Sequence, residues 1–196
     1  HYYSTKKYFY PGTPASNGTN RNSLLFRDPT VDGLKTGHTA AAGYCLVATA
    51  KRDLPNVGSR RLISIVLGAA SENARANESQ KLLNWGYAAF DSVKLFDAEQ
   101  AVATPEVWKG KANTVKIGRT TPIVVTVPAG SGGKLSTEVV RQDPLIAPFT
   151  KGQAMGTLKV KMGADTVAEV PLVALETVEQ AGIFGRAWDA IRLWIK

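Results

Sequence analysis

The sequence predicts an α+β protein in which an antiparallel sheet with one covering helix is followed by a small all-β domain and a short amphipathic helix. Three strands are predicted for the sheet, at residues 31–39, 44–50 and 62–67, and the last two are apolar, partly β-branched runs, as strands buried on two faces tend to be. Residues 74–83 are strong helix formers without Gly or Pro, and apolar side chains at helical spacing continue this pattern to Phe90.

From residue 97 onward Val, Thr, Gly and Pro dominate, which indicates short strands joined by turns. In residues 158–162, Leu-Lys-Val-Lys-Met, apolar and basic side chains alternate strictly, as they do in a half-exposed strand. Gly163-Ala164-Asp165 is a plausible hairpin turn after it. Strands are predicted at residues 114–117, 123–127, 136–141, 156–162 and 167–173.

Composition excludes several classes of function. The chain has 196 residues and 44% hydrophobic content, enough for one core or two small ones. Its net charge of +8 favours anionic partners, but the charge is spread along the chain and lacks the basic-aromatic pattern of a nucleic-acid module. One cysteine, Cys45, and two histidines are too few for a disulfide or an all-protein metal centre. We therefore predict no metal and no nucleic-acid partner, and no organic cofactor is implied either.

Residues 183–196 form the amphipathic helix. Its apolar side chains, with Phe184, Trp188, Ile191 and Trp194 among them, lie on one arc, and its charged side chains lie on the opposite side. The segment is too short and too charged to span a bilayer. Two interpretations follow from the residues alone: a helix lying in a membrane interface, or a helix packed on the all-β domain.

The string from Val31 to Thr39 contains Lys35-Thr36-Gly37, the third motif of the penicillin-recognising serine enzymes. A strand with this motif can pair with a bound peptide through its backbone. Lys35 supplies positive charge near the nucleophile, the Thr36 hydroxyl can donate to a substrate carboxylate, and Gly37 lets the ligand approach the backbone.

Three blocks together resemble the D-alanyl-D-alanine carboxypeptidases, the low-molecular-mass penicillin-binding proteins. They are residues 32–48 with Gly-Leu-Lys-Thr-Gly-His-Thr, residues 61–68, and Arg75 followed by Glu-Ser-Gln-Lys-Leu-Leu-Asn-Trp-Gly at 78–86. Beyond them, the all-β region and the terminal helix resemble that family's second domain and membrane anchor. The resemblance covers nearly the whole chain and favours the membrane interpretation of the helix.

The resemblance implies how the chain is divided. Residues 1–95 would be the C-terminal part of a penicillin-binding, transpeptidase-like (β-lactamase-like) catalytic domain. Residues 96–182 would be the all-β domain, and residues 183–196 the membrane-anchoring helix. Lys35, Thr36 and Gly37 would line the active-site cleft, with His38 beside them and Arg75 near the substrate carboxylate.

The implied activity is that of a serine-type D-alanyl-D-alanine carboxypeptidase. It would remove the last D-alanine of peptidoglycan stem peptides through an acyl-enzyme, and β-lactam antibiotics would bind in the same cleft. The resemblance also implies the periplasmic face of a bacterial inner membrane, with the helix on its anionic surface. Two alternatives stay open: a β-lactamase relative, and a non-enzymatic module that binds the cell wall.

The family needs two further motifs upstream, Ser-x-x-Lys with the nucleophile and Ser-x-Asn with a proton relay. The string at residues 4–7 fits the first, but it lies only 31 residues before Lys35. The string at residues 71–73 fits the second but follows Lys35, which is the wrong order. We reject both and expect the true motifs upstream of His1.

Overall fold

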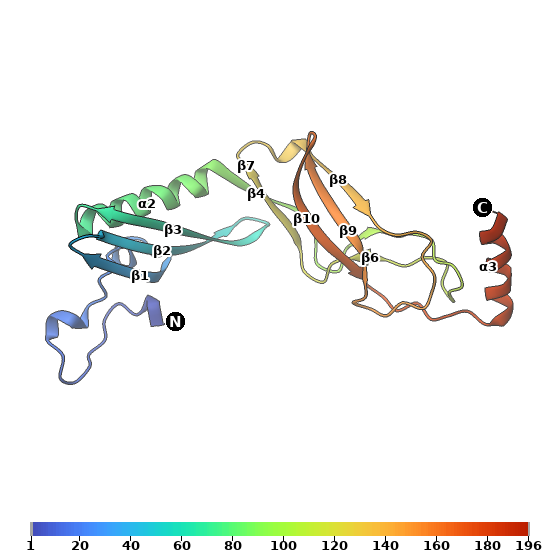
Figure 1. Cartoon of the computed structure of the whole chain (residues 1–196), viewed down its shortest axis with the longest axis horizontal. Coiled ribbons are helices and arrows are strands. Elements are labelled where there is room, and N and C mark those ends of the chain that lie inside the picture. The colour runs from blue at the N-terminus through green and yellow to red at the C-terminus, as the bar shows by residue number, and fades with distance from the viewer. Residues whose placement is uncertain (1, 196) are drawn as a thin grey trace. The chain divides into compact units, whose positions relative to one another are not determined.

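The computed structural model describes residues 2–195, and the side chain of residue 195 is outside that description, as is Lys196 of the predicted anchor. The chain forms two compact units that divide between Ser92 and Val93. Both contain antiparallel strands, and the predicted α+β class is confirmed (Figure 1).

The first unit contains a three-stranded antiparallel sheet of β1 (Val31–Thr39), β2 (Gly43–Leu54) and β3 (Gly58–Ala69), in that order. β1 is therefore an edge strand. Short helical turns precede it, at η1 (Tyr2–Ser4), η2 (Ala15–Gly18) and α1 (Leu24–Arg27).

The polar residues between the second and third predicted strands belong largely to the strands. Lys51 pairs with Arg61 and Leu54 with Gly58, so the connection is a tight turn rather than the long loop expected for residues 51–59. The positive φ values of Asn56 (62°) and Gly58 (102°) suit this turn. The loop prediction was wrong because it relied on the polarity of these residues, and a strand with one exposed face also accepts polar side chains.

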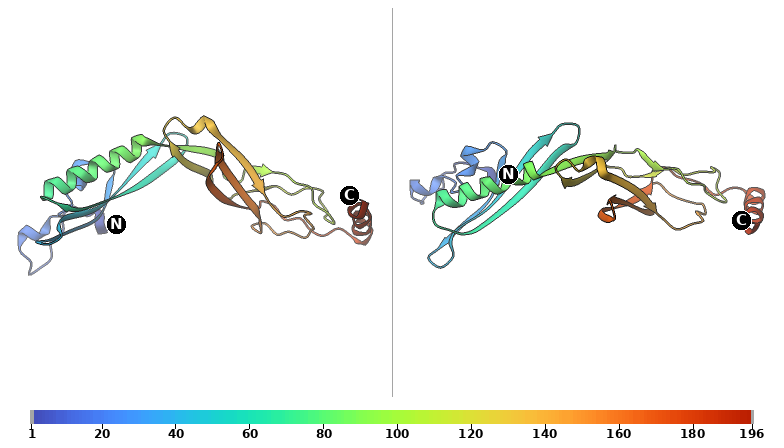
Figure 2. Two further views of the ribbon diagram at one scale, coloured as in Figure 1. Left: turned by 45° about the horizontal axis from the view of Figure 1, so that its top comes forward. Right: turned by 90° about the horizontal axis from the view of Figure 1, so that it is seen from above.

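Helix α2 (Glu72–Ala89) lies along one face of this sheet, as both views of Figure 2 show. The Ser71 side chain accepts a hydrogen bond from the backbone N–H of Ala74 at 3.0 Å and so caps the helix. Between helix and sheet lies a small core of Leu24, Leu25, Val31, Leu46, Ala48, Ala50, Ala76 and Leu83.

The opposite face of β3 carries an exposed apolar row. Ile63, Ile65 and Leu67 occupy every second position and are each more than 60% exposed. Successive strand residues point to opposite faces, so all three lie on the face away from α2. We call them the β3 apolar row.

The second unit is mainly β. A five-stranded sheet has the order β5-β6-β10-β9-β8, and β4 pairs with β7. Its core contains sixteen buried residues, including Val115, Ile117, Leu158 and Leu172. The turn predicted at Gly163-Ala164-Asp165 joins β9 and β10, although Asp165 itself already begins β10, and Gly163 has a φ of 65°. The elements are β4 (Phe90–Phe96), β5 (Ala101–Ala103), β6 (Ile117–Gly118), β7 (Ile123–Pro128), η3 (Gly132–Lys134), β8 (Leu135–Val140), β9 (Ala154–Met162), β10 (Asp165–Ala174) and α3 (Ile183–Ile195).

Two elements differ from the prediction. Phe90 was expected to continue the helix but instead begins β4, with extended backbone at a φ of −133°. β5 was not predicted, and the strand expected at 114–117 is reduced to β6 and an isolated bridge between Thr114 and Glu106. No helix in the described part of the chain is long and apolar enough to cross a membrane.

Candidate functional site

The Lys-Thr-Gly motif lies on the edge strand β1 beside a cavity of about 510 Å³. The structure brings all five predicted site residues to this one cavity, although Arg75 comes from α2 and the other four from β1. We call it the β1 cavity. Its lining residues are Arg21, Lys35, Thr36, Gly37, His38, Tyr44, Glu72 and Arg75.

Hydrogen bonds fix the strand that carries the motif. At its start, the buried Asn22 side chain donates to the carbonyl of Gly33 at 3.0 Å. Asp32 accepts two hydrogen bonds from the Arg61 guanidinium, both at 2.6 Å, and one from the Thr49 hydroxyl at 2.5 Å. The Arg61 hydrogen bonds are the main reason why the pKa of Asp32 is lowered to about 2, with Thr49 contributing further.

Arg75 holds the far end of the motif. Its side chain is only 3% exposed, and its guanidinium donates to the carbonyls of Gly37 at 3.2 Å and Arg21 at 3.3 Å. A third hydrogen bond, at 3.1 Å, goes to the Glu72 carboxylate. Five N–H donors are available on a guanidinium. These three contacts tie α2, β1 and the segment before α1 together, which gives Arg75 a structural role in shaping the cavity.

The other motif residues are more accessible. The Lys35 ammonium donates to the carbonyl of Thr36 at 2.5 Å. The His38 ring stacks on Tyr44, its cross-strand neighbour, with ring centroids 4.0 Å apart. Arg75 lies 5.5 Å from the centroid of the same tyrosine ring. Three cationic side chains and one carboxylate, Glu72, line the cavity, so its charge favours an anionic group.

Sequence reasoning missed Arg21, Tyr44 and Glu72 as lining residues. Tyr44 could have been found, because the short β1–β2 connection fixes the register that places it opposite His38. Arg21 gave no local signal, since its place depends on a contact with Arg75, 54 residues away. Neither Ser4, in η1, nor Ser71, the helix cap, lines the cavity.

Helix α3 meets the rest of its unit through its polar face. The Asp189 carboxylate accepts a hydrogen bond from the backbone N–H of Lys109 at 2.7 Å. The Arg192 guanidinium lies 5.3 Å from the ring centroid of the buried Trp108. The Ala181 backbone N–H, just before the helix, donates to the carbonyl of Lys109 at 2.8 Å.

The apolar face of α3 points away from the strands. Phe184 is 92% and Trp194 is 89% exposed, and Trp188 and Ile191 are also more than half exposed. Of the two sequence interpretations, packing on the all-β unit is thus correct for the polar side of the helix. The hydrogen bonds and the cation–ring contact of α3 described above involve none of the four residues predicted to anchor the chain.

Two family models match the chain. Residues 2–71 match the D-alanyl-D-alanine carboxypeptidase family, and residues 90–180 match the C-terminal domain of penicillin-binding protein 5. D-alanyl-D-alanine carboxypeptidase DacC of Escherichia coli is 40% identical over 176 residues, which is 89% of this chain. The chain belongs to the D-alanyl-D-alanine carboxypeptidase family. DacA of Haemophilus influenzae, another member, is 37% identical over 179 residues, or 90% of this chain.

Solved structures of carboxypeptidase-family members resemble this fold. Penicillin-binding protein 5 of Haemophilus influenzae superposes with a TM-score of 0.75 at 34% identity, over 91% of this chain and 50% of that chain. DacD of Francisella tularensis superposes with a TM-score of 0.52 at 36% identity, over 83% of this chain and 39% of that chain. The chain spans 43% of the length of DacC and 44% of that of DacA. Among residues 2–195, no group of three or more His, Cys, Asp or Glu side chains is arranged to hold a metal ion.

Proposed function

We propose that the intact protein is a serine-type D-alanyl-D-alanine carboxypeptidase that trims peptidoglycan stem peptides and also binds β-lactams. The observation that carries the proposal is the Lys-Thr-Gly motif on an edge strand beside a cationic cavity, within a stretch that matches the carboxypeptidase family. Residues 1–95 would be the end of the catalytic domain, residues 96–182 a second domain, and residues 183–196 an anchor.

Strand β1 and three side chains of the β1 cavity have a proposed task. The outer edge of β1 pairs with the extended end of the stem peptide, because β1 has only β2 as a neighbour among the described strands. Thr36 donates its hydroxyl to the terminal carboxylate, and the positive charge of Arg75 faces the same group. Lys35 acts on the nucleophile side, where its charge lowers the pKa of the activating lysine.

The chemical step uses groups upstream of the matched stretch. A serine attacks the carbonyl between the last two D-alanines, and backbone N–H groups stabilise the oxyanion. The C–N bond breaks, D-alanine leaves with the proton that the serine lost, and water then hydrolyses the ester. The cationic cavity supports the part assigned to this chain, which is to hold the free carboxylate of the substrate.

The exposed β3 apolar row supports the proposal that an upstream part of the protein packs against this sheet. Three large apolar side chains in a line are an unusual surface for a finished domain. The curated relatives are more than twice as long as the stretch they share with this chain. We propose that the upstream part of the catalytic domain covers this row and brings the nucleophile to the β1 cavity.

The second part of the proposal concerns location. The protein would lie at the periplasmic face of the inner membrane, with the apolar face of α3 in the lipid interface. Phe184, Trp188, Ile191 and Trp194 form an exposed apolar face, and aromatic side chains are favoured at this depth. Arg186 adds positive charge on the polar side, which favours an anionic surface.

The test is release of D-alanine from a stem pentapeptide by the intact protein, together with covalent labelling by a fluorescent penicillin. Lys35→Ala should lower turnover about 100-fold or more and slow labelling in parallel, because both reactions use the same serine. A protein that rapidly hydrolyses penicillin and leaves the pentapeptide intact would be a β-lactamase relative. A protein with neither reaction would leave only the wall-binding alternative.

A further inference from the structure

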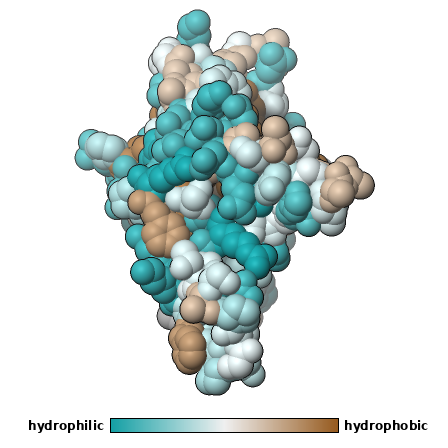
Figure 3. All heavy atoms as spheres, turned by 90° about the vertical axis from the view of Figure 1, so that its left-hand side faces the viewer, coloured by the Kyte–Doolittle hydropathy of each residue, from teal (hydrophilic) through white to brown (hydrophobic). Residues whose placement is uncertain are grey.

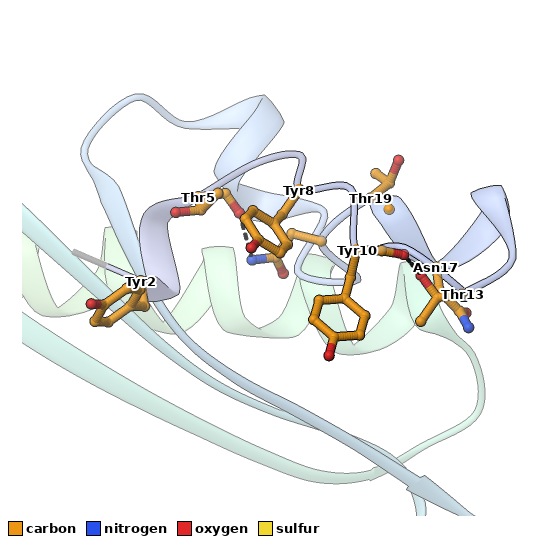
Figure 4. Close-up of a pocket in the computed structure, with 9 residues that line it drawn as sticks. Tyr2, Thr5, Tyr8, Tyr10, Thr13, Asn17 and Thr19 are labelled. Carbon is orange, nitrogen blue, oxygen red and sulfur yellow. Dashed lines mark hydrogen bonds between the residues drawn. The ribbon is translucent and has the colours of Figure 1, made fainter.

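A second cavity is formed by the segment that precedes α1, and all of its lining residues lie between Tyr2 and Asn20. It measures about 580 Å³, and we call it the tyrosine pocket. Figure 4 shows the labelled rings of Tyr2, Tyr8 and Tyr10 along one side of this segment, with Thr13 and Asn17 at one end. The lining residues of the tyrosine pocket are Tyr2, Thr5, Tyr8, Tyr10, Thr13, Asn17, Gly18, Thr19 and Asn20.

The lining has a distinct chemistry. It contains three aromatic rings, three threonine hydroxyls and two amide side chains, and none of its residues carries a formal charge. Tyrosine rings present broad faces that pack against the C–H faces of a ring, while hydroxyls and amides both donate and accept hydrogen bonds. This combination suits a neutral ligand rich in hydroxyl and amide groups. It does not suit a free carboxylate, which needs cationic partners.

Hydrogen bonds hold the segment around the pocket. The Asn20 amide donates to the carbonyls of Thr5 at 3.1 Å and Tyr3 at 3.4 Å. Lys7 and Thr19 form an antiparallel bridge, and the N–H of Tyr8 donates to the carbonyl of Gly18 at 2.9 Å. The pocket is therefore shaped in advance, which lowers the entropy lost when a ligand binds.

The tyrosine pocket adjoins the β1 cavity. Asn20 lines the first and the next residue, Arg21, lines the second. The Arg21 guanidinium also donates to Asn17 Oδ1 at 3.3 Å, and Asn17 lines the tyrosine pocket. A ligand with an anionic peptide end and a neutral saccharide end would find matching chemistry on the two sides of Arg21. Figure 3 views this end of the molecule, where the surface is mostly hydrophilic and hydrophobic groups are small and separate.

We propose that the tyrosine pocket is a saccharide subsite that takes a neutral N-acetylated sugar of the glycan strand. This inference rests on the proposed function in one respect: it makes the sugar part of the same peptidoglycan whose stem peptide enters the β1 cavity. Tyr8 and Tyr10 provide the stacking faces. Thr5, Thr19 and the Asn17 amide provide hydrogen bonds to the hydroxyl and acetamido groups.

The probe is the trimer of N-acetylglucosamine, and binding is measured by NMR on the 196-residue chain and on the intact protein. The trimer should shift the tyrosine ring signals in both. Tyr8→Ala and Tyr10→Ala should each weaken binding about tenfold, the usual scale for a lost aromatic contact. Phe9→Ala is the matched control, because Phe9 lies between them and is similarly exposed but does not line the pocket.

Three results would overturn the subsite: no shift with the trimer, equal losses from Phe9→Ala and Tyr8→Ala, or binding by the chain that disappears in the intact protein. The last would mean that the rest of the protein covers the pocket. D-alanine release by the intact protein is measured separately. Saccharide binding without carboxypeptidase activity would refute the proposed function alone, and activity without saccharide binding would refute the subsite alone.

Discussion

The Arg75 guanidinium donates to the carbonyl of Gly37 at 3.2 Å, so the cation proposed to face the substrate also supports the backbone of the motif strand. The same side chain contacts Arg21 and Glu72 and is nearly inaccessible to solvent. Two roles thus meet in one residue, and they predict different measurable effects.

The structural role of Arg75 predicts a loss of stability. In Arg75→Ala the carbonyls of Gly37 and Arg21 lose a hydrogen-bond donor, and the removed buried side chain leaves a cavity. We expect a loss of about 2–4 kcal/mol in the free energy of unfolding of the 196-residue chain, measured by urea denaturation. Lys81→Ala, which removes an exposed cation from the same helix, should change stability by less than about 0.5 kcal/mol. Equal effects of the two substitutions would contradict the structural role.

The binding role of Arg75 predicts a dependence on the substrate's C-terminus. In the intact protein, Arg75→Ala should lower kcat/KM for a peptide with a free carboxylate by about 1–3 kcal/mol, the scale of a lost charge-assisted hydrogen bond. The loss should be much smaller for the same peptide with an amidated end. Lys35→Ala should affect both peptides alike. If Arg75→Ala lowers both values equally, Arg75 shapes the cavity and does not bind the carboxylate.

Asp32 predicts a dependence of stability on pH. Its pKa in the folded chain is about 2, below the ordinary value of 3.8, because Arg61 and Thr49 bind the ionised form. A lowered pKa stabilises the fold above pH 3.8, and this contribution is lost as the pH falls from about 4 through 2. The stability difference between the wild-type chain and Asp32→Asn should be about 0.5–1 kcal/mol at pH 7, since the pair is partly exposed. It should shrink below pH 4, and a constant difference down to pH 2 would contradict the assignment.

How much the sequence predicts depends on whether the signal is local. The bounds of β1 are those expected for residues 31–39, because an apolar start and the motif mark the strand. The α2–β4 junction was misplaced, since no Gly or Pro lies between Tyr87 and Phe90 to mark the end of the helix, and the pairing of β4 with β7 ends it there. Only the family resemblance predicted that Lys35 and Arg75 belong to the same site. The contacts of Arg75 with Gly37 and Arg21 span 38 and 54 residues, and no local pattern encodes them.

The two faces of α3 predict separate effects. Trp188→Ala and Trp194→Ala should each weaken binding of the intact protein to anionic vesicles about tenfold, because each removes a large apolar side chain from the lipid interface. Asp189→Ala removes the acceptor of the Lys109 N–H but leaves the apolar face intact. It should speed hydrogen exchange at Lys109 while vesicle binding stays within about twofold. Vesicle binding that persists in both tryptophan variants would make α3 purely structural.

The β3 apolar row predicts that the catalytic domain can be assembled from two pieces. The 196-residue chain alone should not be labelled by a fluorescent penicillin, because Ser4 lies outside the β1 cavity. Labelling of the chain that maps to Ser4 would show that its rejection as the nucleophile was wrong. When the upstream part of the gene product is added as a separate polypeptide, labelling should appear, and it should map to a serine of that upstream part.

Ile65→Lys tests whether the upstream piece packs on the β3 apolar row. Ile65 is exposed in the chain, so a lysine there should leave the stability of the chain nearly unchanged. In the assembled domain the same lysine would be buried against apolar groups, which is costly without a partner charge. We expect about a 100-fold higher concentration of the upstream piece to be needed for labelling. Leu82→Lys is the control, since Leu82 is exposed on α2, the helix on the other side of the sheet. If Ile65→Lys and Leu82→Lys reduce labelling equally, the β3 apolar row is not the surface on which the upstream part packs.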